Sequence, residues 1–237
     1  MKLSVFHTPE LVPSQGLADC AIAIDILRAT TTIVTALANG AEAVQVFADL
    51  EILQQASAAH PPALTLRAAE RGGAKVAGYD LGNSPFDYGA EVVAGKRIFM
   101  STTNGTRALA QVQDCAVVLA AAMVNLGAIV QYIQAIQPET VWIVGSGWQG
   151  SYALEDTACA GAIVDALQGE LINDEAYGAV ALYQTWRDRL EQLFTRASHG
   201  QRLLGLDCAA DLAYAAELDR FNVVPKQVAP GILKVVA

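Results

Sequence analysis

The sequence contains few charged residues and few cysteines, and both shortages restrict what the protein can be. Charged residues make up 16% of the 237 residues and hydrophobic residues 53%, a composition that favours a packed core over disorder. No two cysteines form a C-x-x-C pair, so the sequence does not support a zinc or thiol redox motif. We interpret the four cysteines as small buried thiols in a reducing cytoplasm. They are Cys20, Cys115, Cys159 and Cys208.

Basic clusters and long apolar runs are also missing. The net charge is −9 and no Lys/Arg cluster occurs, so we expect no nucleic-acid partner. The longest apolar stretch, residues 115–124, is too short to cross a bilayer, and the first residues lack the apolar core of a signal peptide. We therefore expect a cytoplasmic protein with no membrane partner. The three histidines, His7, His60 and His199, lie outside the motifs described below, which disfavours Ser-His-Asp and phosphohistidine chemistry.

Short apolar runs alternate with longer helical stretches along the chain. We expect strands over 2–6, 19–25, 42–48, 63–66, 96–101, 115–121 and 140–145, and helices over 30–39, 49–59, 103–112, 125–136, 153–168 and 174–197. The strands are continuous Val, Ile and Ala runs, which is typical of strands covered on both faces. The pattern predicts an α/β fold, a three-layer α/β/α sandwich with a largely parallel or mixed central sheet. No linker divides residues 1–237, so we predict a single domain.

Two regions depart from this alternation. Residues 68–90 hold five of the 19 glycines and predict a long ordered loop. Residues after 170 predict a mainly helical, solvated outer layer, and residues 222–236 one or two returning strands.

Polar residues follow the predicted strands, where open α/β sheets bind their ligands. In the first such segment, AIDILRATTT, Asp25 lies at the end of a buried strand. An unpaired buried carboxylate is costly, so we expect a metal ion or an arginine to compensate its charge. Arg28 and the hydroxyls of Thr30, Thr31 and Thr32 lie at a helix start that favours an anion. The alternative is an N-capped helix with a local Asp–Arg pair.

Two more segments carry polar side chains suited to oxyanions. The loop contains Glu70, Arg71, Asn83 and Ser84. The alternative is that these residues stabilise a purely structural loop through Asx turns. The third segment supplies hydroxyls, an amide, a flexible glycine and a cation at a strand-to-helix turn. The alternative interpretation is that these residues only cap a helix. Its residues are Thr102, Thr103, Asn104, Gly105, Thr106 and Arg107.

The fourth segment, GSGWQG at residues 145–150, has the G-x-G-x-x-G spacing of dinucleotide-binding turns. A dinucleotide site also needs a second strand ending in an acid about 20 residues later, and no convincing one follows. Glu155 and Asp156 in the first turn of the next helix would repel a pyrophosphate but suit a cation. An NAD(P)-dependent oxidoreductase and a non-catalytic anion-binding protein remain the alternatives to the interpretation that follows.

Four blocks of the sequence resemble the 2-phosphosulfolactate phosphatase (ComB) family. They are IDILRATTTIVTALANGA, ERGGAKVAGYDLGNSP, STTNGTRAL and LEDTACAG, in family order between residues 20 and 165. The resemblance implies an α/β/α phosphoric monoester hydrolase that uses Mg²⁺. It would hydrolyse 2-phosphosulfolactate to sulfolactate and phosphate, a step of coenzyme M biosynthesis, or act on another small phosphorylated acid.

The resemblance and the residue chemistry together predict roles for the motif residues. Asp25 and Glu70 would be catalytic, one of them accepting the proton of an attacking water, or Asp25 would instead form an aspartyl phosphate. Some of Asp25, Glu70, Glu155 and Asp156 would hold Mg²⁺. The arginines and hydroxyl-rich turns would bind the substrate, and the apolar composition predicts a homodimer.

Overall fold

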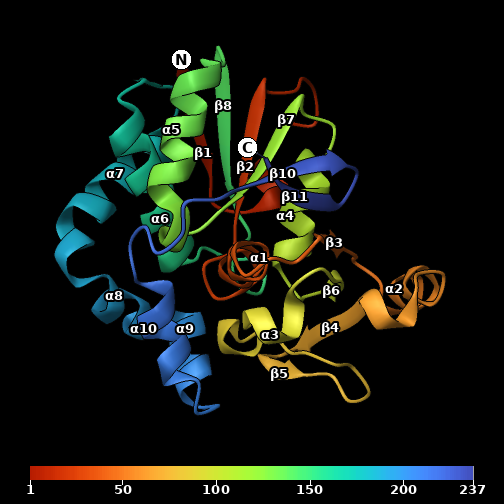
Figure 1. The fold of residues 1–237 in the computed structure, drawn as a ribbon. Helices are drawn as coiled ribbons and strands as arrows, with labels where there is room; N and C mark the ends of the chain where they lie inside the picture. Colours follow the sequence, from red (N-terminus) through yellow and green to blue (C-terminus); the bar gives the residue numbers. More distant parts are fainter. Residues whose placement is uncertain (237) are drawn as a thin grey trace.

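The computed structural model describes residues 1–236, in which eleven strands form one mixed sheet (Figure 1). The strands are β1 (Lys2–Phe6), β2 (Cys20–Ile24), β3 (Ala43–Val46), β4 (Thr65–Arg71), β5 (Ala74–Lys75), β6 (Arg97–Ser101), β7 (Val117–Ala121), β8 (Thr140–Gly145), β9 (Glu170–Leu171), β10 (Val224–Ala229) and β11 (Ile232–Val236). Their order across the sheet is β5-β4-β6-β3-β11-β10-β7-β2-β8-β1-β9. All seven predicted strands are present.

The sheet consists of two parallel halves that run in opposite directions. Strands β9, β1, β8, β2 and β7 are mutually parallel, as are β3, β6 and β4, and the antiparallel hairpin β10–β11 joins the halves. In a flat sheet the carboxyl ends of the two halves would lie at opposite edges. Neighbouring strands twist by roughly 20–25°, so the five steps from β2 to β6 turn the sheet by more than about 90°. This twist lets the carboxyl ends of β2 and β6 approach each other.

Helices cover both faces of the sheet, which confirms the predicted α/β/α layers (Figure 1). Alternate residues of β2 point to opposite cores. The helices are α1 (Ala29–Ala38), α2 (Leu50–Ala58), α3 (Ala90–Val93), α4 (Gly105–Val112), α5 (Leu126–Ile136), α6 (Leu154–Leu167), α7 (Asp174–Trp186), α8 (Leu190–Arg196), α9 (Ser198–Leu204) and α10 (Ala209–Ala215). Ile22 and Ile24 of β2 pack in the core that includes α5 and α6, and Ala21 and Ala23 pack in the core that includes α4.

Helix α1 occupies the middle of the molecule (Figure 1). Residues 29–37 are all buried, including four threonines, so the helix has no solvated face. A helix that is buried on every side belongs to the interior of a protein. Its first turn therefore lies deep inside the molecule, where β2 ends.

The predicted helix over 174–197 was wrong as a single element. It is divided into α7, a 3₁₀ turn at Arg187–Arg189 and α8. The guanidinium groups of Arg189 and Arg196 both lie over the ring of Trp186, 5.0 and 5.1 Å from its centre. In one continuous helix, Arg196 would be about 15 Å along the axis from Trp186, so this contact requires the break.

The loop predicted over 68–90 begins later than expected, because β4 continues to Arg71. Ala68 and Ala69 pair with β6 although they lack the β-branched side chains that indicate strands. The region after 170 is also more than a solvated layer. Phe194, Leu203 and Leu212 are almost fully buried in the main core.

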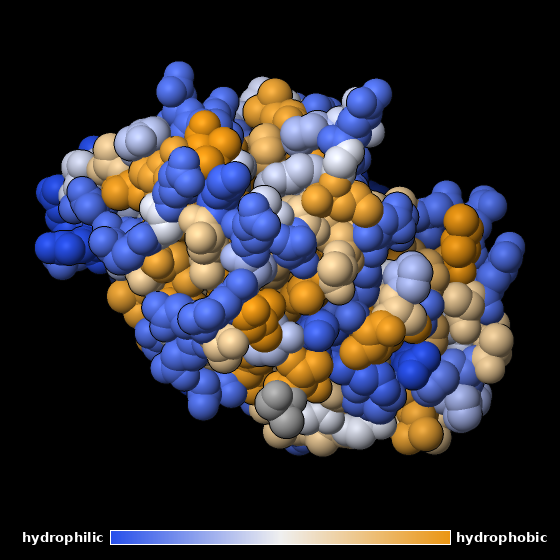
Figure 2. All heavy atoms as spheres, turned by 90° about the horizontal axis from the view of Figure 1, so that it is seen from above, coloured by the Kyte–Doolittle hydropathy of each residue, from blue (hydrophilic) through white to orange (hydrophobic). Residues whose placement is uncertain are grey.

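No helix among the described residues is long and apolar enough to cross a membrane. On the face seen from above, hydrophobic residues are interspersed with hydrophilic ones (Figure 2).

Candidate active site

Asp25 lies where the first turns of α1 and α4 meet. Its Oδ1 accepts a hydrogen bond from the backbone N–H of Ala29 at 3.3 Å, and a Cβ added to Gly105 would lie only 2.7 Å from its Oδ2. Gly105 therefore allows the two helix starts to close around one carboxylate. Burial raises the pKa of Asp25 to about 7, and the negative charge of Glu70 adds to the rise, while the Ala29 N–H and the Arg28 charge oppose it.

Glu70 is the next-to-last residue of β4, in the opposite half of the sheet, yet its charge lies close enough to Asp25 to raise the pKa of that carboxyl. Its Oε1 accepts a hydrogen bond from the N–H of Gly73 at 2.5 Å, and its Oε2 accepts one from the N–H of Thr103 at 3.3 Å. The Thr103 hydroxyl also lies 3.3 Å from Oε1. Glu70 thus links the glycine turn after β4 to the turn after β6. The structure brings together the two residues predicted to be catalytic.

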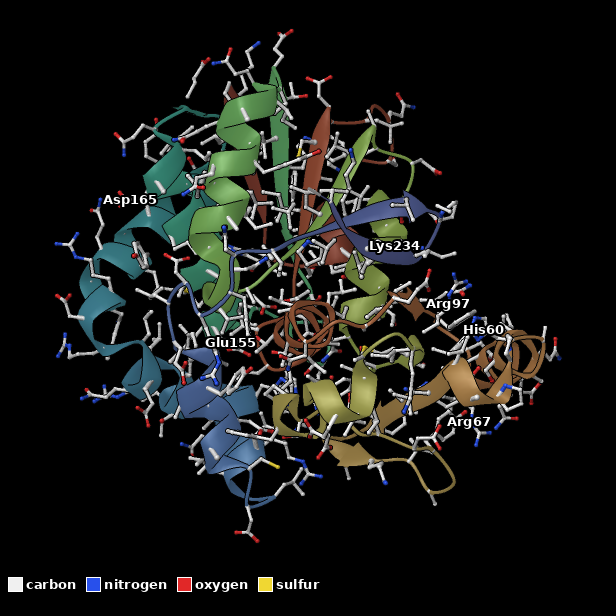
Figure 3. All side chains as sticks on the ribbon, in the orientation of Figure 1. His60, Arg67, Arg97, Glu155, Asp165 and Lys234 are labelled. Carbon is white, nitrogen blue, oxygen red and sulfur yellow. The ribbon has the colours of Figure 1, made fainter. Side chains whose placement is uncertain are left out.

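Glu155 begins α6 in the interior of the molecule, next to the C-terminal helices (Figure 3). Its Oε2 is buried with no hydrogen-bond partner among the described residues, and its Oε1 lies 3.9 Å from Nδ1 of His199. Burial raises the pKa of Glu155 to about 7, and the charge of Asp25 contributes to the rise. Burial and the charges of Arg28 and Arg202 lower the pKa of His199 to about 4, so this imidazole is neutral at pH 7.

Asp156 has a different environment, because backbone N–H groups satisfy both of its oxygens. Oδ1 accepts a hydrogen bond from Ile26 at 2.8 Å, and Oδ2 accepts one each from Ser146 and Gly147 at 3.1 Å. The carboxylate therefore occupies the donors of the G-x-G-x-x-G turn that a pyrophosphate would need. The turn joins β8 to α6 and offers no support for the oxidoreductase alternative.

Arg28 is buried and bonded within the protein through both of its Nη atoms. Its Nη1 donates to Oδ2 of Asp211 at 2.5 Å and its Nη2 donates to the carbonyl of Gly73 at 2.6 Å. Ser84 donates to the other oxygen of Asp211 at 2.7 Å. These contacts fasten α1, α10 and the loop after β5 to one another, so the structure uses Arg28 and Ser84 to hold elements together.

The threonine hydroxyls of α1 also bond within the protein. Thr30, Thr31 and Thr32 donate to the carbonyls of Asp25, Ile26 and Asn83 at 2.8–2.9 Å. These contacts match the alternative of a helix start stabilised by its own side chains.

The remaining predicted binding residues divide into two groups. Thr106 donates to the carbonyl of Thr102, and the exposed Arg107 forms an ion pair with Glu10. Buried polar atoms without a partner among the described residues are found at Asn83 Oδ1 and Thr102 Oγ1. Arg71 extends from the end of β4 to the end of β6, where it donates to the Ser101 hydroxyl at 2.9 Å.

Glu70 lines a small cleft, which has a free volume of about 80 Å³. Its lining residues are Glu70, Gly72, Gly73, Thr103, Asn104, Trp148, Gln149, His199 and Arg202. The rings of Trp148 and His199 are stacked, 5.7 Å between centres. A larger surface hollow of about 290 Å³ includes His60 and Arg67, which lie around α2 and β4, far from Glu155 (Figure 3).

Sequence reasoning missed the contribution of the C-terminal region to this site. His199 and Arg202 line the cleft from α9, and Asp211 fixes Arg28 from α10. These residues belong to no short sequence motif. They lie more than 40 residues beyond Asp156, in a helical region whose polar residues follow no recognisable spacing. His199 was set aside because it falls outside every motif, although it lies against Glu155.

The buried acids Asp25, Glu70, Glu155 and Asp156 suit one hard cation that is held by few protein ligands. Among residues 1–236, no group of three or more His, Cys, Asp or Glu side chains forms a ready-made metal site. Mg²⁺ needs only one or two protein carboxylates, because it keeps most of its waters. Asp25 and Glu155 fit that need, since Glu155 has a buried oxygen without a partner and Asp25 raises its pKa. Asp156 fits poorly because its oxygens are already occupied.

Comparison with known proteins gives a consistent family assignment. The sequence pattern described as 2-phosphosulpholactate phosphatase matches residues 6–230. A protein of Synechocystis sp. named "Probable 2-phosphosulfolactate phosphatase" is 57% identical over 98% of this chain and 99% of its own length. A protein of Gloeobacter violaceus with the same name is 58% identical, over 98% of each chain.

Proposed function

The chain belongs to the 2-phosphosulpholactate phosphatase family, and on that premise we propose that it hydrolyses 2-phosphosulfolactate, or a closely related phosphorylated acid, at the cleft above Asp25, Glu70 and Glu155. The observation that carries the proposal is the group of acids buried where the two half-sheets meet, beneath a small cleft lined by Glu70. Hydrolysis of a phosphate ester needs chiefly positioning and charge stabilisation, and this arrangement can provide both.

We propose Mg²⁺ as the cofactor, with Asp25 and Glu155 as its protein ligands. When bound, the cation would polarise the phosphate and acidify a water molecule. Two carboxylates that are both buried and close in space destabilise each other when ionised, and a divalent cation removes that conflict.

Of the predicted acids, Glu70 alone lines the cleft, so we assign it as the base that accepts the proton of the attacking water. Asp25 does not line the cleft, which favours direct attack by water over an aspartyl phosphate on Asp25. Asn104, directly before α4, lines the cleft and would bind phosphate oxygens together with the start of that helix, while Thr103 holds Glu70 in place.

The proposal is tested by phosphate release from a panel of esters with Mg²⁺ or with EDTA. The panel contains 2-phosphosulfolactate, 2-phosphoglycerate and glycerol 2-phosphate. We expect release from 2-phosphosulfolactate with Mg²⁺, none with EDTA, and a large loss in Glu70→Gln but not in Glu91→Gln, an exposed control. Hydrolysis that persists unchanged in EDTA, or no hydrolysis of any ester, would contradict it.

A single turnover in ¹⁸O-water separates the two mechanisms. Direct attack places the label in the released phosphate. Label found in the carboxylate of Asp25 would replace direct attack with an aspartyl-phosphate intermediate.

The location of the protein is a further proposal. All four cysteines are unpaired, and three of them are buried. Thiols in this state suit the reducing cytoplasm. Fractionation of the source cells with an antibody would test this, and recovery outside the cytoplasm would contradict it.

A further inference from the structure

The arginines around the cleft differ in whether an acid already neutralises them. Arg28 is paired with the buried Asp211, and Arg107 with Glu10. Arg71 and Arg202 form no ion pair with any carboxylate in the part of the chain that the structure describes, and of these two only Arg202 lines the cleft. Its charge is therefore available to a ligand in a way that the charge of Arg28 is not.

The backbone already orients Arg202. Its Nε and Nη2 both donate to the carbonyl of Gly72, at 3.2 and 3.0 Å. Arginine has five N–H donors in a planar fork, so most of them remain free after this contact. The guanidinium thus has a defined position at the glycine turn that also carries Glu70's partner, Gly73.

Arg202 lies on the same side of the cleft as His199, which contacts Glu155. His199 and Arg202 are three residues apart in α9, so they project from the same side of the helix. Both line the cleft together with Glu70, Thr103 and Asn104. A small ligand with its phosphate at Asn104 therefore meets the guanidinium of Arg202 within the same cleft.

We propose that Arg202 is a specificity-determining residue that binds a second oxyanion of the substrate, a carboxylate or sulfonate, and so selects phosphorylated acids over simple phosphate esters. The inference rests on the proposed function, because it assigns one part of the substrate to one side chain. A guanidinium binds such groups through paired hydrogen bonds, which supply both affinity and orientation. Without a second anion, an ester loses this interaction while its phosphate site is unchanged.

The test compares three esters that differ in the anionic groups they carry besides phosphate. Glycerol 2-phosphate has a hydroxymethyl group where 2-phosphoglycerate has a carboxylate, and 2-phosphosulfolactate carries both a carboxylate and a sulfonate. In Arg202→Gln we expect KM for 2-phosphosulfolactate to rise about 10- to 100-fold, with little change in kcat. The kcat/KM for glycerol 2-phosphate should stay within about twofold, and Arg202→Lys should recover part of the loss.

The control variant is Arg196→Gln, which removes an exposed arginine on α8 and should leave every rate unchanged. Equal losses for all esters in Arg202→Gln would show that Arg202 only supports the glycine turn and would overturn the inference, as would no loss for any. If wild-type protein hydrolyses no ester, the proposed function fails. Calorimetry with sulfolactate then decides on Arg202, and an unchanged Kd in Arg202→Gln would overturn its role.

Discussion

Replacing Glu155 by glutamine should stabilise the protein in neutral and alkaline solution without divalent cations. The pKa of Glu155 rises from 4.5 to about 7, chiefly through burial. Such a rise corresponds to about 3 kcal/mol, at about 1.4 kcal/mol for each pH unit. Between pH 4.5 and 7 the folded protein holds the proton more tightly than the unfolded chain. The free energy of unfolding therefore falls as the pH increases through this window.

Glutamine cannot ionise, so the variant escapes this loss. At pH 8 in EDTA, Glu155→Gln should be more stable than wild type by about 3 kcal/mol, or roughly 6–12 °C in Tm for a chain of this size. At pH 5, where wild-type Glu155 is mostly protonated, the two proteins should agree within about 1 kcal/mol. Thermal unfolding followed by circular dichroism measures both values.

Glu191→Gln, at an exposed position of α8, controls for the loss of one negative charge. It should show no pH-dependent difference from wild type. If the Tm of Glu155→Gln differs from that of wild type by the same amount at pH 5 and pH 8, or is lower than wild type at pH 8, then burial does not raise the pKa of Glu155. Mg²⁺ should raise the Tm of wild type and raise that of Glu155→Gln much less.

Three further substitutions test the contacts that shape the site, each by urea unfolding. Asp156→Asn leaves one side-chain oxygen for three buried N–H donors, so it should lower the free energy of unfolding by about 2–4 kcal/mol. A decrease below about 0.5 kcal/mol would contradict the role of Asp156 in fixing the glycine turn. Gly147→Ala should cost at least about 1 kcal/mol more than Gly150→Ala, because both glycines have positive φ but only at Gly147 would a Cβ meet a backbone oxygen, at 2.4 Å; equal costs would disprove this. Arg28→Gln should cost about 3–5 kcal/mol by leaving Asp211 buried and unpaired, and Asp211→Asn added to it should recover part of the loss.

Much of the fold follows from the sequence because apolar runs mark buried strands. The run CAIAI at Cys20–Ile24 is buried at every position, which is the pattern expected for a strand covered on both faces. The end of β4 was missed because the sequence AAER carries no such signal. The directions of the strands could not be predicted either. No local pattern shows that the antiparallel pairings of β10 and β11 make the two halves of the sheet run in opposite directions.

The motifs predicted which residues lie near one another but not what each side chain contacts. Asp25, Glu70 and Glu155 come together as expected, whereas Arg28 is directed to Asp211 and the α1 threonines to backbone carbonyls. Sequence alone shows that a side chain can bind an anion, but only packing shows whether another group already occupies it. The cleft wall formed by His199 and Arg202 depends on long-range docking of α9, which leaves no mark in short-range spacing.

The central claim is that the acids buried between the half-sheets form a phosphatase site. The most direct measurement is phosphate release from 2-phosphosulfolactate with Mg²⁺ by wild type, Asp25→Asn and the exposed control Asp114→Asn. We expect Asp25→Asn to stay folded and to lose about 100-fold or more in kcat/KM, and Asp114→Asn to match wild type. A folded Asp25→Asn protein that hydrolyses the ester at the wild-type rate would show that the buried acids are not the phosphatase site.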